Sequence, residues 1–278
     1  MRCAAVVCDG TGSLDAPLIL HGLITGACNG SCDGCRYRRA SGELDRGIDW
    51  WIQRVEEFAD LGGRTFAIGG GEPTLVDGLQ DLVDAAKARG LIVSMTTNGV
   101  LRRVVEGLDL VHVSCDDHHP LSQSEVVRTV EFYRGFVPSV GVNVVLWSDD
   151  DLRHVRVFPR STLIMPKPWW SDPPAVDEIA SLIGSGGDVM ADSCLATWMN
   201  QERYAEFRTP CLQGRVSMCI DDIGRASVCS HAPDRLKVEA GTVAEMWNAI
   251  RLRGGAWEGK TLGDCLASWN GVGSYDAC

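Results

Sequence analysis

The feature that most constrains this chain is a loop of three closely spaced cysteines, Cys28, Cys32 and Cys35. They have a C-x3-C-x2-C spacing and lie in a glycine-containing stretch directly after an apolar segment. Closely spaced cysteines hold iron–sulfur clusters, whereas structural zinc sites more often combine two C-x2-C pairs or add histidines. The loop therefore predicts a [4Fe-4S] cluster with three protein ligands and one open iron, with a zinc site or free thiols as the alternatives.

The remaining cysteines and the overall charge limit the compartment and the partners. The chain has 278 residues, 12 cysteines and a net charge of −11. No apolar run approaches the ~20 residues that a membrane span needs, and the start of the chain is unlike a signal peptide. We therefore expect a cytoplasmic protein, in which reduced cysteines indicate metal binding or catalysis. The acidic balance argues against nucleic acid as a partner.

Strand-like and helix-like patterns alternate about six times across residues 17–187. The strands are expected at residues 17–25, 65–68, 91–95, 110–114, 140–146 and 162–165. The helices are expected at residues 48–61, 75–88, 101–106, 121–133, 150–157 and 176–183. Such alternation predicts an α/β fold in which helices cover parallel strands, either as an open sheet or as a barrel.

Unusual polar or glycine-rich segments follow the first four predicted strands. The cysteine loop follows the first, and residues 69–73 (GGGEP) follow the second. Residues 96–99 (TTNG) follow the third, and residues 114–119 (SCDDHH) follow the fourth. Active sites of parallel α/β proteins lie at the carboxyl ends of the strands. We therefore expect these four segments to meet at one mouth.

Residues 188–278 have a different character. The strand–helix rhythm stops and six of the cysteines lie in this part. The pattern of residues 219–229 predicts a hairpin. That of residues 243–252 predicts a helix with Met246 and Trp247 on its inner side. We expect a small cysteine-bearing domain here, which at such a size needs a metal to hold its fold.

The three-cysteine loop, the GGGEP segment and the TTNG segment together resemble the radical S-adenosylmethionine (SAM) superfamily over residues 17–187. The resemblance implies a partial (β/α)6 TIM-like barrel and a [4Fe-4S] cluster on the three cysteines, with SAM bound to the fourth iron. It also implies reductive cleavage of SAM to a 5′-deoxyadenosyl radical that abstracts a substrate hydrogen, with flavodoxin or ferredoxin as the reductant. Gly34 departs from the aromatic residue of most members, and Tyr37 is expected to substitute for it.

The resemblance also assigns SAM contacts to the strand ends. The glycines let the backbone approach the ligand closely, and the proline fixes the turn. An asparagine in the fifth strand needs polar partners, which a ligand can supply. The expected SAM-binding residues are Gly69, Gly70, Gly71, Glu72, Pro73, Thr97, Asn98, Ser114, Asp116 and Asn143. The alternative for each is an ordinary turn or a satisfied core residue.

The C-terminal cysteines resemble the SPASM/twitch extension of radical SAM enzymes. Cys211, Cys229 and residues 241–248 carry this resemblance, and the shortened twitch form fits better because the full SPASM cysteine run is absent from the sequence. It implies one auxiliary [4Fe-4S] cluster in residues 188–278. Its expected ligands are Cys194, Cys211, Cys229 and Cys265, with Cys219 or Cys278 as alternatives to Cys194.

Three side chains near the fourth strand are candidates for catalysis. His118 and His119 have the chemistry of an acid, a base or a substrate ligand, and an exposed loop position explains them equally well. Cys115 is either a packing residue or a hydrogen-atom donor.

Two classes of substrate fit the resemblance. In the first, a carbinol of a small polar natural-product intermediate (an aminocyclitol or a sugar) is oxidised or epimerised, as in the twitch-type aminoglycoside dehydrogenases. In the second, a maturase modifies a ribosomally made peptide. Many such maturases carry an N-terminal peptide-binding domain, for which the residues before Cys28 are expected to leave no room. A non-catalytic iron–sulfur or zinc scaffold is the third reading.

Overall fold

A curved sheet forms the centre of the computed structural model. The structure describes residues 14–32, 35, 37, 45–158, 160–164, 176–184, 188–192, 194–195, 213–232, 237–239 and 241–254. Within these residues the sheet has nine strands in the order β7-β6-β5-β4-β3-β2-β1-β8-β9. The strands are β1 (Ile19–Leu23), β2 (Thr65–Gly69), β3 (Ile92–Thr97), β4 (Leu110–Ser114), β5 (Ser139–Val145), β6 (Ser161–Ile164), β7 (Val189–Ala191), β8 (Ser217–Ile220) and β9 (Ala226–Ser227).

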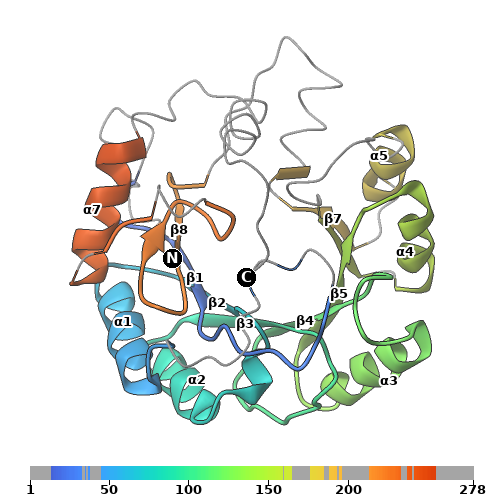
Figure 1. Ribbon diagram of the computed structural model, residues 1–278, viewed down its shortest axis with the longest axis horizontal. Helices are drawn as coiled ribbons and strands as arrows, with labels where there is room; N and C mark the ends of the chain where they lie inside the picture. Colours follow the sequence, from blue (N-terminus) through green and yellow to red (C-terminus); the bar gives the residue numbers. More distant parts are fainter. Residues whose placement is uncertain are drawn as a thin grey trace.

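The helices cover the outer face of this sheet (Figure 1). They are α1 (Ile48–Asp60), α2 (Leu79–Ala88), α3 (Gln123–Arg134), α4 (Arg153–Val157), α5 (Val176–Gly184) and α7 (Val243–Gly254), with the short 3-10 turns η1 (Pro73–Leu75) and η2 (Asp149–Leu152). All neighbouring strands from β7 to β8 are parallel, and β8 pairs with β9 antiparallel. The predicted α/β fold with a parallel sheet is therefore confirmed.

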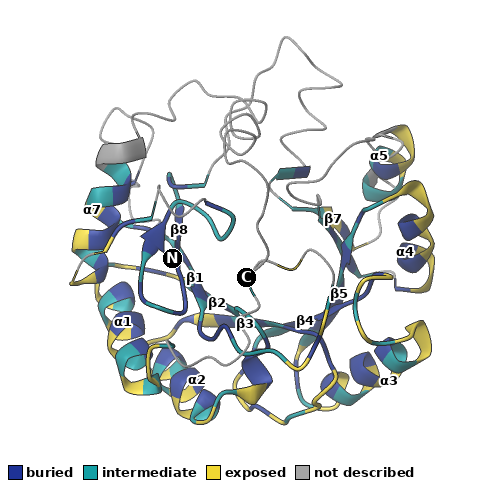
Figure 2. Ribbon diagram, in the orientation of Figure 1, coloured by how far each residue is buried: buried dark blue, intermediate teal, exposed yellow. Residues whose placement is uncertain are grey.

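The hydrophobic core lies between the sheet and the helices (Figure 2). Successive strand residues point to opposite faces, and the buried set includes Leu20, Phe66 and Val111. Trp51 and Phe58 of α1 are fully buried against this layer. Burying a side chain of this size contributes about 1.5–3 kcal/mol. The spacing of apolar residues along the strands and helices therefore determines which face of each packs into the core.

The opposite, concave face of the sheet is polar. Asn143 Nδ2 of β5 donates to Thr96 Oγ1 of β3 across the intervening β4, at 3.4 Å. Thr162 of β6 likewise reaches His112 of β4, with 3.4 Å between Oγ1 and Nε2. Contacts between alternate strands are typical of the interior of a barrel. The interior of this curved sheet is therefore lined in part by hydroxyl, amide and imidazole groups.

One expected helix is wrong. The segment after β3, residues 98–109, is extended or turned, and no helix forms at residues 101–106. Val100, Val104 and Val105 are β-branched, which lowers helix propensity. Arg103 Nη1 also donates to the carbonyls of Thr74 at 3.2 Å and Val76 at 2.8 Å, which holds the segment against η1. An extended segment, not a helix, therefore connects β3 and β4.

Most other boundaries lie within two residues of expectation, but the helix expected at residues 75–88 begins at Leu79, and strand β7 was not expected. The hairpin exists as β8 and β9, and its turn needs Gly224, whose φ is +86°. The helix α7 buries Met246 and Trp247, and Trp247 Nε1 donates to the Leu14 carbonyl at 3.0 Å. Strands β7, β8 and β9 all lie beyond residue 187 yet belong to the same sheet as β1–β6. The division into domains 1–187 and 188–278 stays a prediction.

Among the described residues, no helix has both the length and the hydrophobicity to cross a membrane.

Candidate functional site

The cysteine loop begins where β1 ends, at the carboxyl edge of the sheet. Cys28, Cys32 and Cys35 are free thiols, half-buried or exposed. A Cβ placed on Gly30 would lie 3.5 Å from Cys28 Sγ and 3.7 Å from Cys32 Sγ, so these two thiols flank one backbone position. Burial raises the pKa of Cys32 to about 11, and the nearby Cys35 and Cys28 add to the shift. The three thiols are therefore near one another at the carboxyl edge of the sheet.

The glycine stretch after β2 docks against the start of this loop. Gly71 N donates to the Thr25 carbonyl at 2.7 Å, and Glu72 N donates to the Ala27 carbonyl at 2.8 Å. A Cβ on Gly71 would lie 2.1 Å from the Ala27 carbonyl oxygen, which is impossible. Gly70 also has a φ of +127°, which disfavours other residues. Only glycine allows the two loops to approach this closely.

Glu72 holds the ends of two strands together. Its side chain is fully buried. One oxygen, Oε1, accepts from Thr74 N at 3.1 Å, Thr74 Oγ1 at 2.6 Å and Thr97 Oγ1 at 2.8 Å. The other, Oε2, accepts from Asn98 N at 2.7 Å. Four protein donors therefore use the acceptor sites of this carboxylate. Its observed contacts join the glycine stretch to the end of β3.

Asn98 extends this network to the cysteines. Its amide Nδ2 donates to Asn29 Oδ1 at 2.8 Å and lies 3.6 Å from Cys28 Sγ. Its Oδ1 accepts from Val100 N at 3.0 Å, which fixes the orientation of the amide. Donors near ligating sulfurs stabilise negative charge there and tune the potential of an iron–sulfur cluster.

The end of β4 contributes a second buried carboxylate. Asp116 Oδ2 pairs with His119 Nδ1 at 2.8 Å, and Asp116 Oδ1 accepts from His118 N at 3.0 Å. The charge of Asp116 also contributes to the raised pKa of Cys32, so β4 and the cysteine loop meet at one mouth. Ser114 is buried at the same strand end. His118 is exposed, and its ring packs on Trp147 with 4.7 Å between ring centroids.

Cys115 contacts a histidine from a later helix. It is buried, and its Sγ lies 3.6 Å from His154 Nδ1. Burial, with Asp116 and Asp117 nearby, raises the pKa of Cys115 to about 12. The thiol is therefore protonated at neutral pH and is a poor nucleophile.

The second group of cysteines is only partly within the described residues. Cys211, Cys265 and Cys278 lie outside them. Cys219 is buried on β8; burial raises its pKa, and the nearby Cys229 adds to the shift, so these two thiols are neighbours. Cys194 packs against the hydrophobic core.

A tyrosine connects the two cysteine-bearing regions. Tyr37, two residues after Cys35, has its hydroxyl 2.9 Å from a ring nitrogen of His231 and 3.3 Å from Ser230 Oγ. His231 follows Cys229 by two positions. The segment that carries Cys229 therefore contacts the segment that carries Cys35.

Several residues that shape this mouth escaped the sequence analysis. Thr74 and Asn29 satisfy Glu72 and Asn98, and Asp45 accepts from Thr25 Oγ1 and, at 3.0 Å, from Gly26 N. Each is a polar residue within or close to a predicted motif, which was the available signal. A group of Asp117, Asp151 and His154 was also missed, although its last two members are spaced one helical turn apart.

The fold and the mouth together define a class: a curved parallel α/β sheet with a loop of three cysteines at its carboxyl edge. Residues 23–147 match the sequence model of the Radical SAM superfamily. A curated relative, "Probable GTP 3′,8-cyclase" of Methanopyrus kandleri, is 32% identical over 145 residues. That match covers 45% of this chain and 47% of the relative, so it spans about half of each.

Solved structures support the fold. The chain is similar to Streptococcus suis SuiB, with a TM-score of 0.71, 14% identity and coverage of 91% of this chain and 70% of SuiB. It is also similar to anSMEcpe, solved with bound AdoMet, with a TM-score of 0.56, 17% identity and coverage of 84% and 80%. At these identities the likeness concerns the fold alone.

Proposed function

We propose that this protein is a radical SAM enzyme, and the observation that carries the proposal is the shared position of three free thiols. The thiols fit a [4Fe-4S] cluster, because Cys28 and Cys32 flank Gly30 and the charge of Cys35 acts on Cys32. Asn98 also directs an amide donor toward Cys28 Sγ. A cluster with three cysteine ligands leaves one iron for the amino and carboxylate groups of SAM. When bound, the cluster supplies the electron that cleaves SAM, and the resulting carbon radical abstracts a substrate hydrogen.

The residues around the thiols then have distinct roles. The backbone of Gly69, Gly70 and Gly71 offers groups to the methionyl amine, because no Cβ prevents close approach. The carboxylate of Glu72 accepts from four protein donors and so positions the loop, and Oε2, which accepts only from Asn98 N, can also take a donor of the ligand. Ser114 and Asp116 face the ribose hydroxyls in this proposal. Low-potential flavodoxin or ferredoxin is the reductant, and the cytoplasm is the compartment.

We also propose that the C-terminal cysteines hold one auxiliary [4Fe-4S] cluster of the twitch type. Cys211, Cys229 and Cys265 are three of its ligands. For the fourth, the neighbouring positions of Cys219 and Cys229 support Cys219 beside the original expectation, Cys194. The contact of Tyr37 with His231 supports a short path for electrons between the two regions.

The concave face of the sheet supports a small polar substrate. Thr96, His112, Asn143 and Thr162 provide donors and acceptors there. Burial, with a contribution from the Arg160 guanidinium, lowers the pKa of His112 to about 4, so its imidazole is neutral at physiological pH. We propose that the enzyme oxidises or epimerises a carbinol of an aminocyclitol or sugar. The similarity to a protein named for a reaction of GTP is compatible with a small polar substrate.

Anaerobic reconstitution with iron and sulfide, followed by dithionite and SAM, tests the proposal. We expect 5′-deoxyadenosine from the wild-type protein and none from Cys28→Ala at equal protein folding. Cys194→Ala is expected to retain SAM cleavage, because Cys194 lies outside the SAM-binding loop. If wild-type protein with a full complement of iron and sulfide forms no 5′-deoxyadenosine, only a non-catalytic iron–sulfur scaffold remains.

A peptide maturase is the second candidate, favoured by the structure of SuiB bound to precursor peptide SuiA, which has a TM-score of 0.63 to this chain. Incubation in deuterated water, followed by mass spectrometry of the product, separates the reactions. Loss of two hydrogens from a small metabolite supports the dehydrogenase, and exchange at one carbon supports an epimerase. A modified peptide, with no turnover of aminocyclitols or sugars, supports the maturase.

A further inference from the structure

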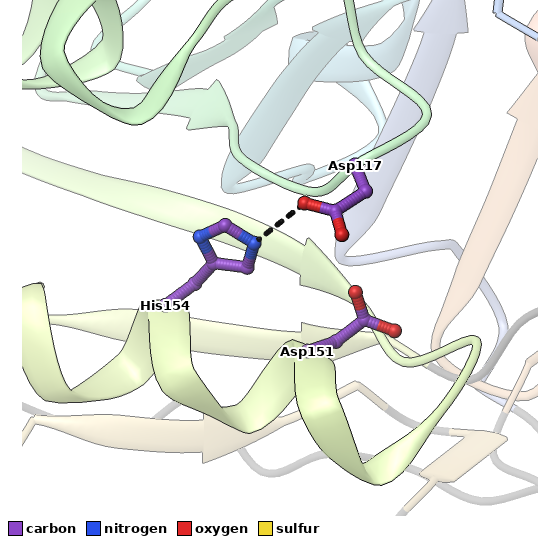
Figure 3. A group of neighbouring side chains, drawn as sticks. All are labelled: Asp117, Asp151 and His154. Atoms are coloured by element: carbon purple, nitrogen blue, oxygen red, sulfur yellow. Dashed lines mark hydrogen bonds and ion pairs between the residues drawn. The ribbon is translucent and has the colours of Figure 1, made fainter.

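Three ionisable side chains converge beside the mouth, outside the proposed SAM site. Asp117 follows β4, Asp151 lies in η2 and His154 in α4, and Figure 3 shows the three pointing toward one another. One ligand atom from each residue lies within 4.8 Å of the others. His154 Nε2 and Asp117 Oδ1 are 3.3 Å apart. Two ligands on opposite sides of one ion lie about 4.2 Å apart at metal–ligand distances of about 2.1 Å, so small movements suffice for a shared ion.

Each of the three side chains also contacts a residue outside the cluster, and this contact orients it. Cys115 Sγ lies 3.6 Å from His154 Nδ1, so Nδ1 can carry the imidazole proton when an ion takes the place of the proton between Nε2 and Asp117 Oδ1. Asp151 Oδ2 accepts from Trp147 N at 2.9 Å and Ser148 N at 2.8 Å. Arg153 Nη2 bonds to Asp117 Oδ2, which leaves Oδ1 facing His154. Supporting contacts of this kind orient metal ligands in proteins.

The charge balance also favours a cation. Asp151 is buried, and its hydrogen bonds come from neutral groups of Trp147 and Ser148. The two carboxylates outweigh the single guanidinium of Arg153, whose charge acts on both of them. Uncompensated negative charge at a partly buried site is costly, and a bound metal ion would remove that cost.

Solvent and small ligands can reach the cluster through a pocket of about 390 Å³. Its lining includes Asp117, Arg153 and His154, together with Cys115, Asp116 and His119. The pocket therefore offers room for water or for an oxygen-bearing ligand to complete the coordination of an ion. A site of one imidazole and two carboxylates suits first-row divalent cations such as Mn²⁺, Fe²⁺ and Zn²⁺.

We propose that Asp117 Oδ1, one carboxylate oxygen of Asp151 and His154 Nε2 form a mononuclear binding site for a divalent metal ion, distinct from the iron–sulfur clusters. The remaining positions of the ion face the pocket and are filled by water or ligand oxygens. The site does not depend on the proposed SAM chemistry, since none of its three ligands belongs to the cysteine loop.

Mn²⁺ is the probe, and loss of the free-ion electron paramagnetic resonance signal measures its binding. The reconstituted, iron-loaded protein is used with its cluster in the oxidised, diamagnetic state. We expect one Mn²⁺ per chain. Asp151→Asn and His154→Gln are each expected to weaken binding by at least about 10-fold, because even loss of a supporting residue costs about 10–100-fold. Asp150→Asn, a neighbour with the same change of charge, is expected to bind Mn²⁺ as the wild type does.

Asp117→Asn is the ligand variant that is expected to fold normally, because this side chain is 56% exposed. We expect it to weaken Mn²⁺ binding by at least about 10-fold without changing the far-ultraviolet circular dichroism. Mn²⁺ is also expected to raise the midpoint of thermal unfolding of the wild type and of Asp150→Asn alone. Absence of Mn²⁺ binding to the wild type at millimolar concentration would overturn the proposal. Equal affinity of all variants would do the same, whatever the SAM cleavage activity.

Discussion

Glu72→Gln tests whether the buried carboxylate holds the mouth together. A glutamine keeps the shape of the side chain but replaces one acceptor oxygen by an NH₂ group. If the NH₂ group takes the place of Oε2, it faces the donor Asn98 N, and if it takes the place of Oε1, it faces Thr74 N. In either orientation one buried backbone N–H loses its partner.

The expected cost follows from that single loss. A buried donor without a partner costs about 1–3 kcal/mol, and the hydrogen bond that disappears was made to a charged group. For a chain of 278 residues, this destabilisation lowers the unfolding temperature by about 2–5 °C. Because Asn98 also approaches Cys28 Sγ, we expect the variant to bind less iron after reconstitution.

Circular dichroism melts of the anaerobic protein and iron analysis provide the measurements. Glu131→Gln is the matched control, because Glu131 is exposed on α3 and its change is expected to stay within about 0.5 kcal/mol. Equal melting temperatures and equal iron content for the two variants would refute the structural role assigned to Glu72.

Three other predictions concern the same mouth and the sheet. Gly71→Ala is expected to abolish iron loading, since its Cβ would collide with the Ala27 carbonyl, whereas Gly47→Ala, with no atom near its Cβ, should load normally; iron analysis compares them. Asn98→Ala is expected to make the cluster potential more negative in a redox titration, because a donor near Cys28 Sγ is lost. Burial, with Arg160 nearby, lowers the pKa of His112 to about 4, so the unfolded chain takes up the proton first as the pH falls. This group is then expected to contribute a fall in stability of about 2 kcal/mol between about pH 7.5 and about pH 5 in urea titrations. His112→Asn should reduce the fall by that amount and leave the part that comes from buried His21, whose pKa burial also lowers.

The sequence predicted the sheet well because local patterns determine it. β-Branched and apolar residues at strand spacing gave β4 as residues 110–114, and the amphipathic pattern gave α1 within one residue of its observed end. The failure at residues 101–106 has a different origin. There a long-range tether from Arg103 to the carbonyls of Thr74 and Val76 overrides a weak local preference.

The site was predictable in its motifs but not in its contacts. The residues of the GGGEP segment could be singled out, yet the sequence could not indicate that Glu72 accepts from Thr74, Thr97 and Asn98. Thr97 and Asn98 lie at the end of another strand, and their approach to Glu72 depends on strand register. The same holds for Asp117 and Asp151, which lie far apart in sequence and meet because β4 and β5 are neighbours.

The pairing of β8 with β1 has a consequence for how the protein is made. Ile19 pairs with Ser217, about 200 positions later in the chain. Contacts of such long sequence separation form late in folding, because the entropy of closing the loop must be overcome first. Strands β1, β2 and β3 leave the ribosome long before β8, so the cysteine loop can receive its iron on a half-built sheet. For the proposed enzyme with two clusters, we therefore expect the N-terminal loop to receive its cluster first.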